Sequence, residues 1–260
     1  MFNHVEIDTP TLNRKDVNGV RYYDTPSGKK LVSITSVISH YNRQIFADWR
    51  KKIGNEEANK ITKQATSRGT DTHTLIEHYL KNEKLPTVQP LSDMLFKIAK
   101  SDLNNINNIH GLEKPLYSEY LGIAGTVDCI AEYNNELAII DFKTSKKPKK
   151  REWIEGYFVQ CAAYACMLYE LTGLTVKKFV IIMTCENGEC EVYEEYDKAI
   201  TTYFKANPSS KVLDRIIRCL YSKFYTIPLQ KWINAEGFDE KEIGDVLNYF
   251  GTLSSKEQND

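Results

Sequence analysis

Hydrophobic residues recur at helical spacing over much of this chain, as in helices that bury one face. Helices are expected over residues 35–84, 91–109, 155–172 and from 196 onward. Glycines mark the interruptions and the ends of these stretches. Breaks are expected near Gly54 and Gly69, and helix ends at Gly111 and Gly173.

β-Prone runs occur in three pairs, and each pair flanks a short turn. The turns are expected at residues 26–28, 134–135 and 187–188, where Gly and Asn tolerate a positive φ. The order is helices, then a sheet interrupted by a helix, then more helices. This order predicts an α/β or α+β core with helical additions at both ends.

The central hairpin brings two acids together. If Asn134 and Asn135 form its turn, facing residues have numbers that sum to 269, and Asp128 then lies opposite Asp141. Facing side chains in a hairpin have Cβ atoms about 4.5–5.5 Å apart, so two carboxylates there repel each other. Either a divalent cation with oxygen ligands, such as Mg²⁺ or Mn²⁺, or a raised pKa of one acid would stabilise the pair.

Lys143 lies two residues beyond Asp141 and therefore on the same face of the strand. A lysine there can orient or deprotonate a water, or stabilise the charge of a pentacovalent phosphate. Two acids, a cation and a lysine are the groups that hydrolyse a phosphodiester. The alternative is a solvated sheet edge carrying charged residues.

A basic run follows this strand. The chain has 260 residues, 42% of them hydrophobic, and a net charge of −1, so nucleic-acid binding would need local patches. The run supplies one, with Lys146, Lys147, Lys149, Lys150 and Arg151. Pro148 excludes a regular helix through it, and the run could hold a nucleic-acid backbone without sequence preference.

The six cysteines form no C-x-x-C pair, which gives a zinc or iron–sulfur site little support. Free thiols are expected, with a Cys185–Cys190 disulfide as the alternative. No apolar run is long enough to cross a membrane, and the N-terminus has no secretory signal. A cytoplasmic protein, in a bacterium or a phage-infected cell, is therefore expected.

Several motifs together resemble the RecB-like branch of the PD-(D/E)XK nucleases. They are "RGTDTHTLIEHYL", "SEYLGIAGTVDC", "IIDFKTS" and "QCAAY". Within that branch the likeness is to the mitochondrial genome maintenance exonucleases and their phage relatives. The motifs span residues 68–170, and Val127 stands where many members of the superfamily have proline.

The resemblance implies roles for individual residues. Metal ligands would be His73, Asp128, Asp141, the Phe142 carbonyl and the upstream acid Glu119, with Lys143 as the catalytic lysine. From the residues alone, His73 would be a histidine on a helix surface. The resemblance makes Gln160 and Tyr164 groups that contact nucleic acid or position the lysine, and buried polar residues are the alternative. From their positions in the chain, phosphate contacts would be Arg68, a little over one turn before His73, and Lys146, Lys147, Lys149 and Lys150 of the basic run. The cysteine arrangement of the iron–sulfur relatives is missing, so no such cluster is expected.

The expected fold is a restriction-endonuclease-like core, a central mixed sheet flanked by helices, within one nuclease domain. Its expected parts are a hairpin region at 1–34, helices that form an arch at 35–112, a catalytic core at 113–195 and C-terminal helices at 196–260. The expected activity is Mg²⁺- or Mn²⁺-dependent hydrolysis of DNA, as an exonuclease on single-stranded ends. The alternatives are a nuclease subunit active only in a larger repair complex, a non-catalytic single-strand-binding module, and a sequence-specific double-strand endonuclease.

Overall fold

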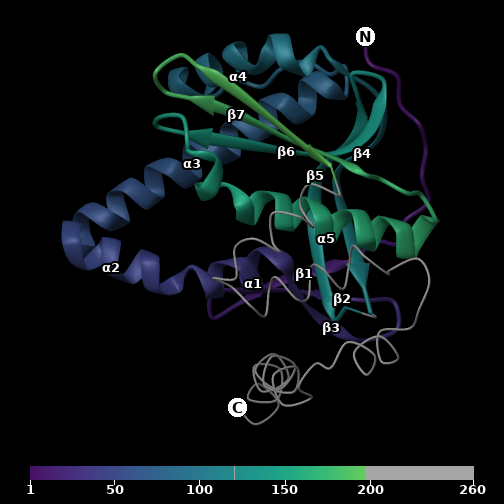
Figure 1. Cartoon of the computed structure of the whole chain (residues 1–260), viewed down its shortest axis with the longest axis horizontal. Helices are drawn as coiled ribbons and strands as arrows, with labels where there is room; N and C mark the ends of the chain where they lie inside the picture. Colours follow the sequence, from purple (N-terminus) through teal and green to yellow (C-terminus); the bar gives the residue numbers. More distant parts are fainter. Residues whose placement is uncertain (120, 197–260) are drawn as a thin grey trace.

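A computed structural model describes residues 1–119 and 121–196 of the chain (Figure 1). The strands are β1 (Asn13–Val17), β2 (Val20–Asp24), β3 (Lys30–Ser33), β4 (Ile106–Ser118), β5 (Ile123–Tyr133), β6 (Glu136–Ser145), β7 (Lys178–Cys185) and β8 (Cys190–Tyr196). The helices are α1 (Ile34–Tyr41), α2 (Arg43–Ile53), α3 (Asn55–Leu80), α4 (Pro90–Leu103) and α5 (Glu155–Thr172), with a short 3₁₀ turn η1 at Arg151–Trp153. The helical C-terminal region expected from residue 196 lies outside the described residues.

All eight described strands form one mixed sheet in the order β1-β2-β3-β5-β6-β7-β8, with β4 paired to β5 as well. The β3–β5 and β6–β7 pairs are parallel and the other pairs are antiparallel. Helix α5 covers one face of the sheet, and α3 and α4 cover the other (Figure 1). A central mixed sheet flanked by helices is the fold that the sequence predicted.

One edge of strand β5 pairs with β4, and the other edge is divided between β6 and β3. β4 pairs with β5 from Ile123 to Tyr133. On the opposite edge, β6 pairs with residues 129–133 and β3 with residues 123–124. Within the described residues no strand pairs with residues 125–128 on that edge, so the sheet opens there into a fork between β5 and β6.

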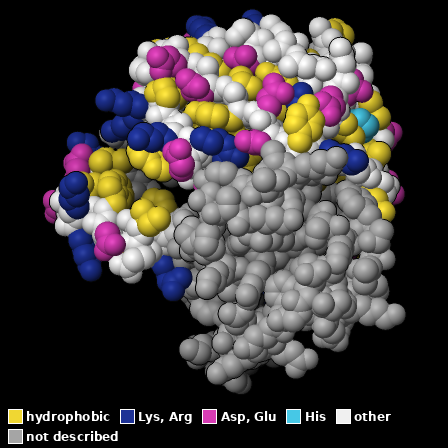
Figure 2. Space-filling model, viewed as in Figure 1, with side chains coloured by type: hydrophobic (Ala, Val, Ile, Leu, Met, Phe, Trp, Pro, Cys, Tyr) yellow, Lys and Arg dark blue, Asp and Glu magenta, His cyan; other side chains and the backbone are white. Residues whose placement is uncertain are grey.

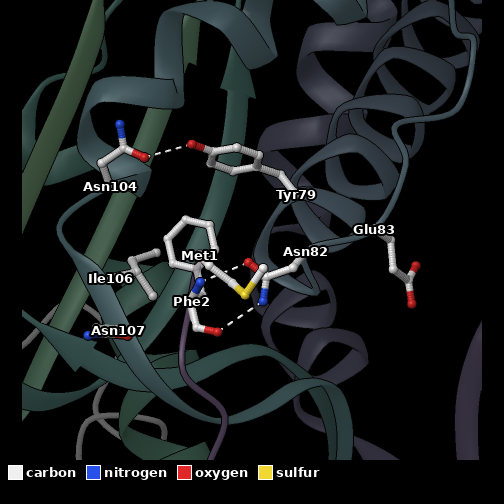
Figure 3. A pocket seen from close by; sticks show the side chains of 8 residues that line it. All are labelled: Met1, Phe2, Tyr79, Asn82, Glu83, Asn104, Ile106 and Asn107. Carbon is white, nitrogen blue, oxygen red and sulfur yellow. Dashed lines mark hydrogen bonds between the residues drawn. The ribbon is translucent and has the colours of Figure 1, made fainter.

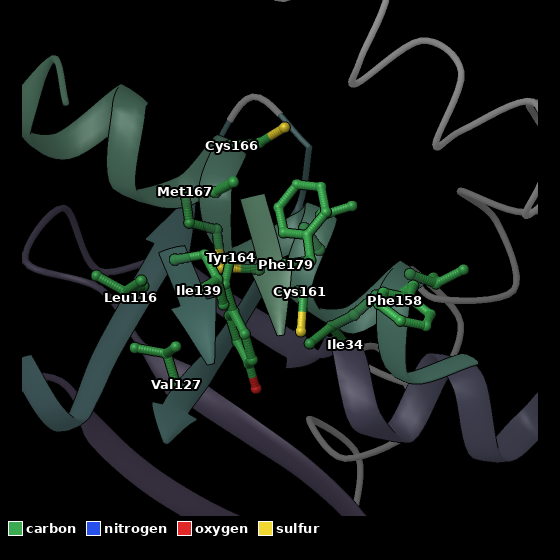
Figure 4. Packing of buried hydrophobic residues seen from close by; sticks show 14 of the residues in the cluster. Ile34, Leu116, Val127, Ile139, Phe158, Cys161, Tyr164, Cys166, Met167 and Phe179 are labelled. Atoms are coloured by element: carbon green, nitrogen blue, oxygen red, sulfur yellow. The ribbon is translucent and has the colours of Figure 1, made fainter. Parts of the chain in front are cut away.

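The core has one cluster on each face of the sheet. On the α5 face, Figure 4 shows Tyr164 and Met167 among Val127, Ile139 and Leu116. The α3 and α4 face buries Leu75, Leu80, Phe96, Leu103, Cys129, Ile140 and Val180, among others. The nearly continuous apolar run of β7 fits this two-sided burial, because both faces of that strand are covered.

Most of the expected elements are confirmed. The three turns join β2 to β3, β5 to β6 and β7 to β8, and α5 ends at Gly173 in a left-handed conformation. The break at Gly54 is also confirmed. The hairpin of β1 and β2 was not expected, although its turn residues Asn18 and Gly19 both have positive φ.

Two expectations about helices were wrong. α3 continues through Gly69, because a single glycine costs a helix only about 1 kcal/mol and tertiary packing overrides it. α4 ends at Leu103, and the residues from Ile106 to Ile109 begin strand β4. Ile106 and Ile109 are buried beside β5, and this sheet pairing outweighs the local helical pattern. The boundary expected between residues 112 and 113 falls inside β4.

The expectations about cysteines and membranes can be compared with the described residues. There, Cys129, Cys161, Cys166, Cys185 and Cys190 are all free thiols, as expected. The described helices include none with both the length and the apolar composition needed to span a bilayer.

Replacing Gly125 with alanine is predicted to destabilise the protein. A Cβ at this position would lie 2.6 Å from Cε1 of the fully buried Tyr164, which cannot move without disturbing the core. The expected loss is about 1–3 kcal/mol in the free energy of unfolding, measured by urea or thermal denaturation. Gly69→Ala is the matched control: its nearest neighbour is 3.8 Å away, and a mid-helix alanine should leave stability equal or slightly higher. Equal midpoints for Gly125→Ala and the wild type would contradict this packing.

Candidate active site

The fork in the sheet brings Asp128 and Asp141 together. The predicted register is confirmed from Tyr133 opposite Glu136 to Cys129 opposite Ile140, and the next position along holds the two acids. There the strands separate, and β6 continues along β7, with Asp141 beside Ile181. Oδ2 of Asp128 accepts a hydrogen bond from the Phe142 N–H at 2.9 Å and so replaces the ladder bond.

Asp141 is almost completely buried, with 1% of its surface exposed. Its Oδ1 accepts a hydrogen bond of 3.1 Å from Nε2 of Gln160 on α5, and its Oδ2 forms an ion pair with Lys143. Burial raises the pKa of Asp141 to about 7, with a further upward contribution from Asp128, although the Lys143 ammonium opposes the shift. The raised pKa of one acid is one of the two ways of stabilising the pair that the sequence left open.

Lys143 is held as a cation in this arrangement. Burial alone would lower its pKa, but the carboxylates of Asp141 and Asp128 outweigh burial and raise it above the ordinary lysine value. Its Nζ also lies 3.4 Å from the Phe142 carbonyl oxygen and 5.0 Å from the centre of the Tyr157 ring. A charged ammonium can donate hydrogen bonds and offset negative charge, and it cannot accept a proton.

His73 reaches the fork from the middle of α3. Its Nε2 lies 2.8 Å from the Phe142 carbonyl oxygen, while Nδ1 lies 3.8 Å from Asp128 and 3.7 Å from Glu113. Burial disfavours the imidazolium, but the charge of Asp128 and the contact with Glu113 prevail and raise the pKa of His73 to about 9. With Nε2–H donated to the carbonyl, Nδ1 is the ring atom that faces the acids.

Glu113 was missed by the sequence analysis. It lies on β4 between the pairs Leu112–Cys129 and Lys114–Val127, and the register therefore sets it opposite Asp128. Its φ of 47° is unusual for a non-glycine residue, and this distortion occurs at the position that faces the site. A predicted turn at residues 119–122 would have identified Glu113. Such a turn pairs Ser118 with Ile123, and in that register Glu113 lies opposite Asp128.

One ligand atom each from His73, Glu113 and Asp128 lie within 4.8 Å of one another. Two carboxylate oxygens and an imidazole nitrogen form a donor set that fits a divalent cation such as Mn²⁺ or Mg²⁺. Among the described residues, Asp141 with its Lys143 partner lies next to this donor set.

Glu119 does not join this cluster. Its carboxylate forms an ion pair with Lys29 at 2.7 Å and accepts hydrogen bonds from Ser27 and Thr25 at the turn between β2 and β3. It lies six residues along the chain from Glu113, which is about 20 Å in an extended strand. Glu119, expected as a metal ligand, therefore lies apart from His73 and Asp128, and Glu113 is the acid of β4 that lies beside them.

Gln160 and Tyr164 lie beneath the site and not on its surface. Both are buried on α5, and Nε2 of Gln160 is 3.4 Å from the hydroxyl of Tyr164 and bonded to Asp141. They were expected to contact nucleic acid or to position the lysine, with buried polar residues as the alternative. Both are buried: Gln160 bonds to Asp141, which pairs with Lys143, and Tyr164 contacts Gln160.

Arg68 also has a different environment from the one expected. It was expected to contact phosphate, but only 10% of its side chain is exposed. Its guanidinium pairs with Glu186, and its Nε donates to Thr144 at 3.3 Å. Arg68 therefore holds Thr144, the residue next to Lys143.

The basic run after β6 is divided between inward and outward side chains. Lys149 donates to the hydroxyl of Tyr157 at 2.7 Å, and Arg151 bonds to Glu195. Lys146, Lys147 and Lys150 are exposed beside the site, as a backbone-binding patch requires.

Two other features lie outside this cluster. The cavity in Figure 3 is lined by Met1, Phe2, Tyr79, Asn82, Glu83, Asn104, Ile106 and Asn107, and it contains none of the expected site residues. Helix α2 buries none of its residues and exposes 57% of Phe46 and 70% of Ile45. Hydrophobic and basic side chains cover the projecting region in Figure 2, where α2 lies in Figure 1.

Known proteins resemble part of the chain. It is 27% identical over 130 residues to the human mitochondrial genome maintenance exonuclease 1, covering 45% of this chain and 37% of that protein. The proteins of that name from mouse and Xenopus tropicalis are 45% identical over 47 residues and 42% identical over 65 residues. These matches cover 18% and 24% of this chain, and 14% and 18% of those proteins. The chain thus matches well under half the length of these relatives.

A crystal structure of a candidate exonuclease from Eubacterium rectale superposes with a TM-score of 0.42 and 15% identity, over 59% of this chain and 66% of that one. That likeness is too weak to support an argument. The family model described as the PD-(D/E)XK nuclease superfamily matches residues 46–206, well over half of the chain. With this match and the fork that joins Asp128, Asp141 and Lys143, the chain belongs to the PD-(D/E)XK nuclease superfamily.

Proposed function

We propose that this chain hydrolyses phosphodiester bonds in DNA with the help of Mg²⁺ or Mn²⁺, as an exonuclease on single-stranded ends. The observation that carries the proposal is the meeting of Asp128, Asp141 and Lys143 in the fork, with His73 and Glu113 beside them. The names of the matched relatives, which are exonucleases, support the same reaction class.

The cation would be held by His73, Glu113 and Asp128, with Asp141 and the Phe142 carbonyl next to them. When bound, it would supply charge that stabilises the phosphorane-like transition state and would make a water more acidic. The Phe142 carbonyl accepts from Nε2 of His73 and so fixes the ring with Nδ1 toward the carboxylates. This is how many metal-binding histidines are oriented. Since metal ligands must be unprotonated, binding would displace the proton from His73.

Lys143 would act on the phosphate and the attacking water as a hydrogen-bond donor. Its ammonium stays charged between Asp141 and the substrate, because the carboxylates raise its pKa. A fixed cation aimed at the developing negative charge of the phosphate needs no reorganisation during the reaction. Gln160 holds Oδ1 of Asp141, so Oδ2 remains directed at Lys143.

The substrate strand would lie on local basic and aromatic surfaces, since the net charge of the chain is only −1. The exposed Lys146, Lys147 and Lys150 adjoin the site. The projecting hairpin of α2 and α3 adds Phe46 and basic residues in the last turn of α2, and it would form the arch that admits a free strand end. Exposed aromatic rings and cations together suit unpaired bases and their phosphates.

Asp141→Asn and Lys143→Ala are predicted to abolish cleavage of single-stranded DNA. Each should lower the rate by at least about 100-fold. Lys143→Ala removes a cation that offsets the negative charge of the transition state, and Asp141→Asn removes the carboxylate that pairs with Lys143 and lies next to the proposed cation. The rate is measured with a labelled oligonucleotide and Mn²⁺, and EDTA should stop the wild-type reaction. Circular dichroism and thermal melting would show that both variants are folded. Full activity in either folded variant, or cleavage that survives EDTA, would refute the mechanism.

Glu113→Gln is predicted to weaken metal binding, because it replaces one of the clustered anionic ligands by a neutral amide. The dissociation constant for Mn²⁺, measured by isothermal titration calorimetry, should rise at least about tenfold. Glu119→Gln is the matched control, since that carboxylate bonds to Lys29 at another place, and it should bind Mn²⁺ as the wild type does. The reverse result would restore Glu119 as the ligand.

A linear single strand is predicted to be degraded and a closed single-stranded circle of the same sequence to resist. The expected difference follows from an arch that needs a free end to enter. Oligonucleotides labelled at the 5′ or the 3′ end would give the polarity from the product pattern. Cleavage of the circle at the same rate would indicate an endonuclease. Purified chain that cuts neither substrate but binds both would favour a subunit of a larger complex or a non-catalytic binding module.

A further inference from the structure

Tyr157 lies in the first turn of α5, between Lys143 and the basic turn at residues 146–150. It belongs to none of the motifs that suggested the family. Its ring centre is 5.0 Å from Nζ of Lys143, within the range of a cation–π contact. Asp141 and Tyr157 are thus two groups that hold the same ammonium, one by charge and one by its aromatic face.

The hydroxyl of Tyr157 makes a second connection. It accepts a hydrogen bond of 2.7 Å from Nζ of Lys149. The carbonyl oxygen of Lys149 accepts a further bond of 2.8 Å from the hydroxyl of Tyr193 on β8. Lys149 is therefore fixed at its side chain and at its backbone, in the middle of an otherwise exposed turn.

Exposed lysines lie on both sides of Lys149 in this turn. Lys147 and Lys150 lie within two residues of Lys149, and with Lys146 they present exposed ammonium groups. Two ammonium groups near one ring repel each other, so a bare pair of lysines would separate. The ring face and the hydroxyl of Tyr157 offset this repulsion and keep both lysines at one place.

We propose that Tyr157 is a positioning residue that couples the basic turn to the catalytic lysine. The hydroxyl sets the turn that holds phosphates flanking the scissile one, and the ring sets the Lys143 ammonium on the scissile phosphate. The proposal rests on the proposed nuclease function and adds how the substrate backbone is aligned with the reacting group. Alignment matters because small displacements of a catalytic group are costly in rate.

Two substitutions separate the two connections. Tyr157→Phe keeps the ring and removes the hydroxyl, so KM for a linear single strand should rise by about 3–10-fold while kcat stays within about twofold. Tyr157→Leu removes both, so kcat should also fall by about tenfold. Tyr193→Phe, which loosens the turn without touching Lys143, should raise KM alone. Tyr196→Phe is the matched control, because its hydroxyl bonds to Glu136, and it should change neither constant.

An NMR measurement tests the same contact without activity. The ε-methylene signal of Lys143 can be assigned by its loss in Lys143→Arg. The ring should shift this signal upfield in the wild type and in Tyr157→Phe, and in Tyr157→Leu the signal should have the chemical shift of an ordinary lysine. If the wild type cleaves nothing but this shift behaves as stated, the nuclease proposal fails and the contact stands. An equal shift in all three proteins, or an unchanged kcat in Tyr157→Leu, overturns the role of Tyr157.

Discussion

Repulsion between carboxylates in the fork is the constraint around which the described structure is arranged. Glu113, Asp128 and Asp141 stand at matching positions on three neighbouring strands, where like charges destabilise a sheet. The strands do not pair at this point: β5 and β6 separate, and β4 adopts a positive φ at Glu113.

The surrounding groups compensate for that charge from both faces of the sheet. His73 comes from α3 on one side, and Lys143 and Gln160 act from the α5 side. The pKa values of His73 and Asp141 are both raised. Burial is the main cause for Asp141, with a further contribution from Asp128, whereas for His73 the charge of Asp128 and the contact with Glu113 outweigh burial. A divalent cation would favour the ionised form of the acids and the neutral form of His73.

Much of the site was predictable because it is local. Asp128, Asp141 and Lys143 lie in one hairpin, whose turn at Asn134 and Asn135 fixes the register, and strand geometry then fixes which side chains share a face. The roles of Gln160 and Tyr164 could not be read in this way. Their spacing shows that they project together from α5, and the sheet was the expected packing partner of that helix, but the bond from Gln160 to Asp141 depends on how the helix packs there.

The sequence by itself determined the order of the elements, the central hairpin and the acids that face each other across it, because neighbouring residues and one short turn decide these features. Only the tertiary structure decided that Glu113, and not Glu119, lies beside His73 and Asp128, that Arg68 pairs with Glu186, and that Tyr157 contacts two lysines. Those contacts link elements far apart in the chain. They depend on which strands pair and on where the sheet opens, and both follow from packing of the whole core against two sets of helices.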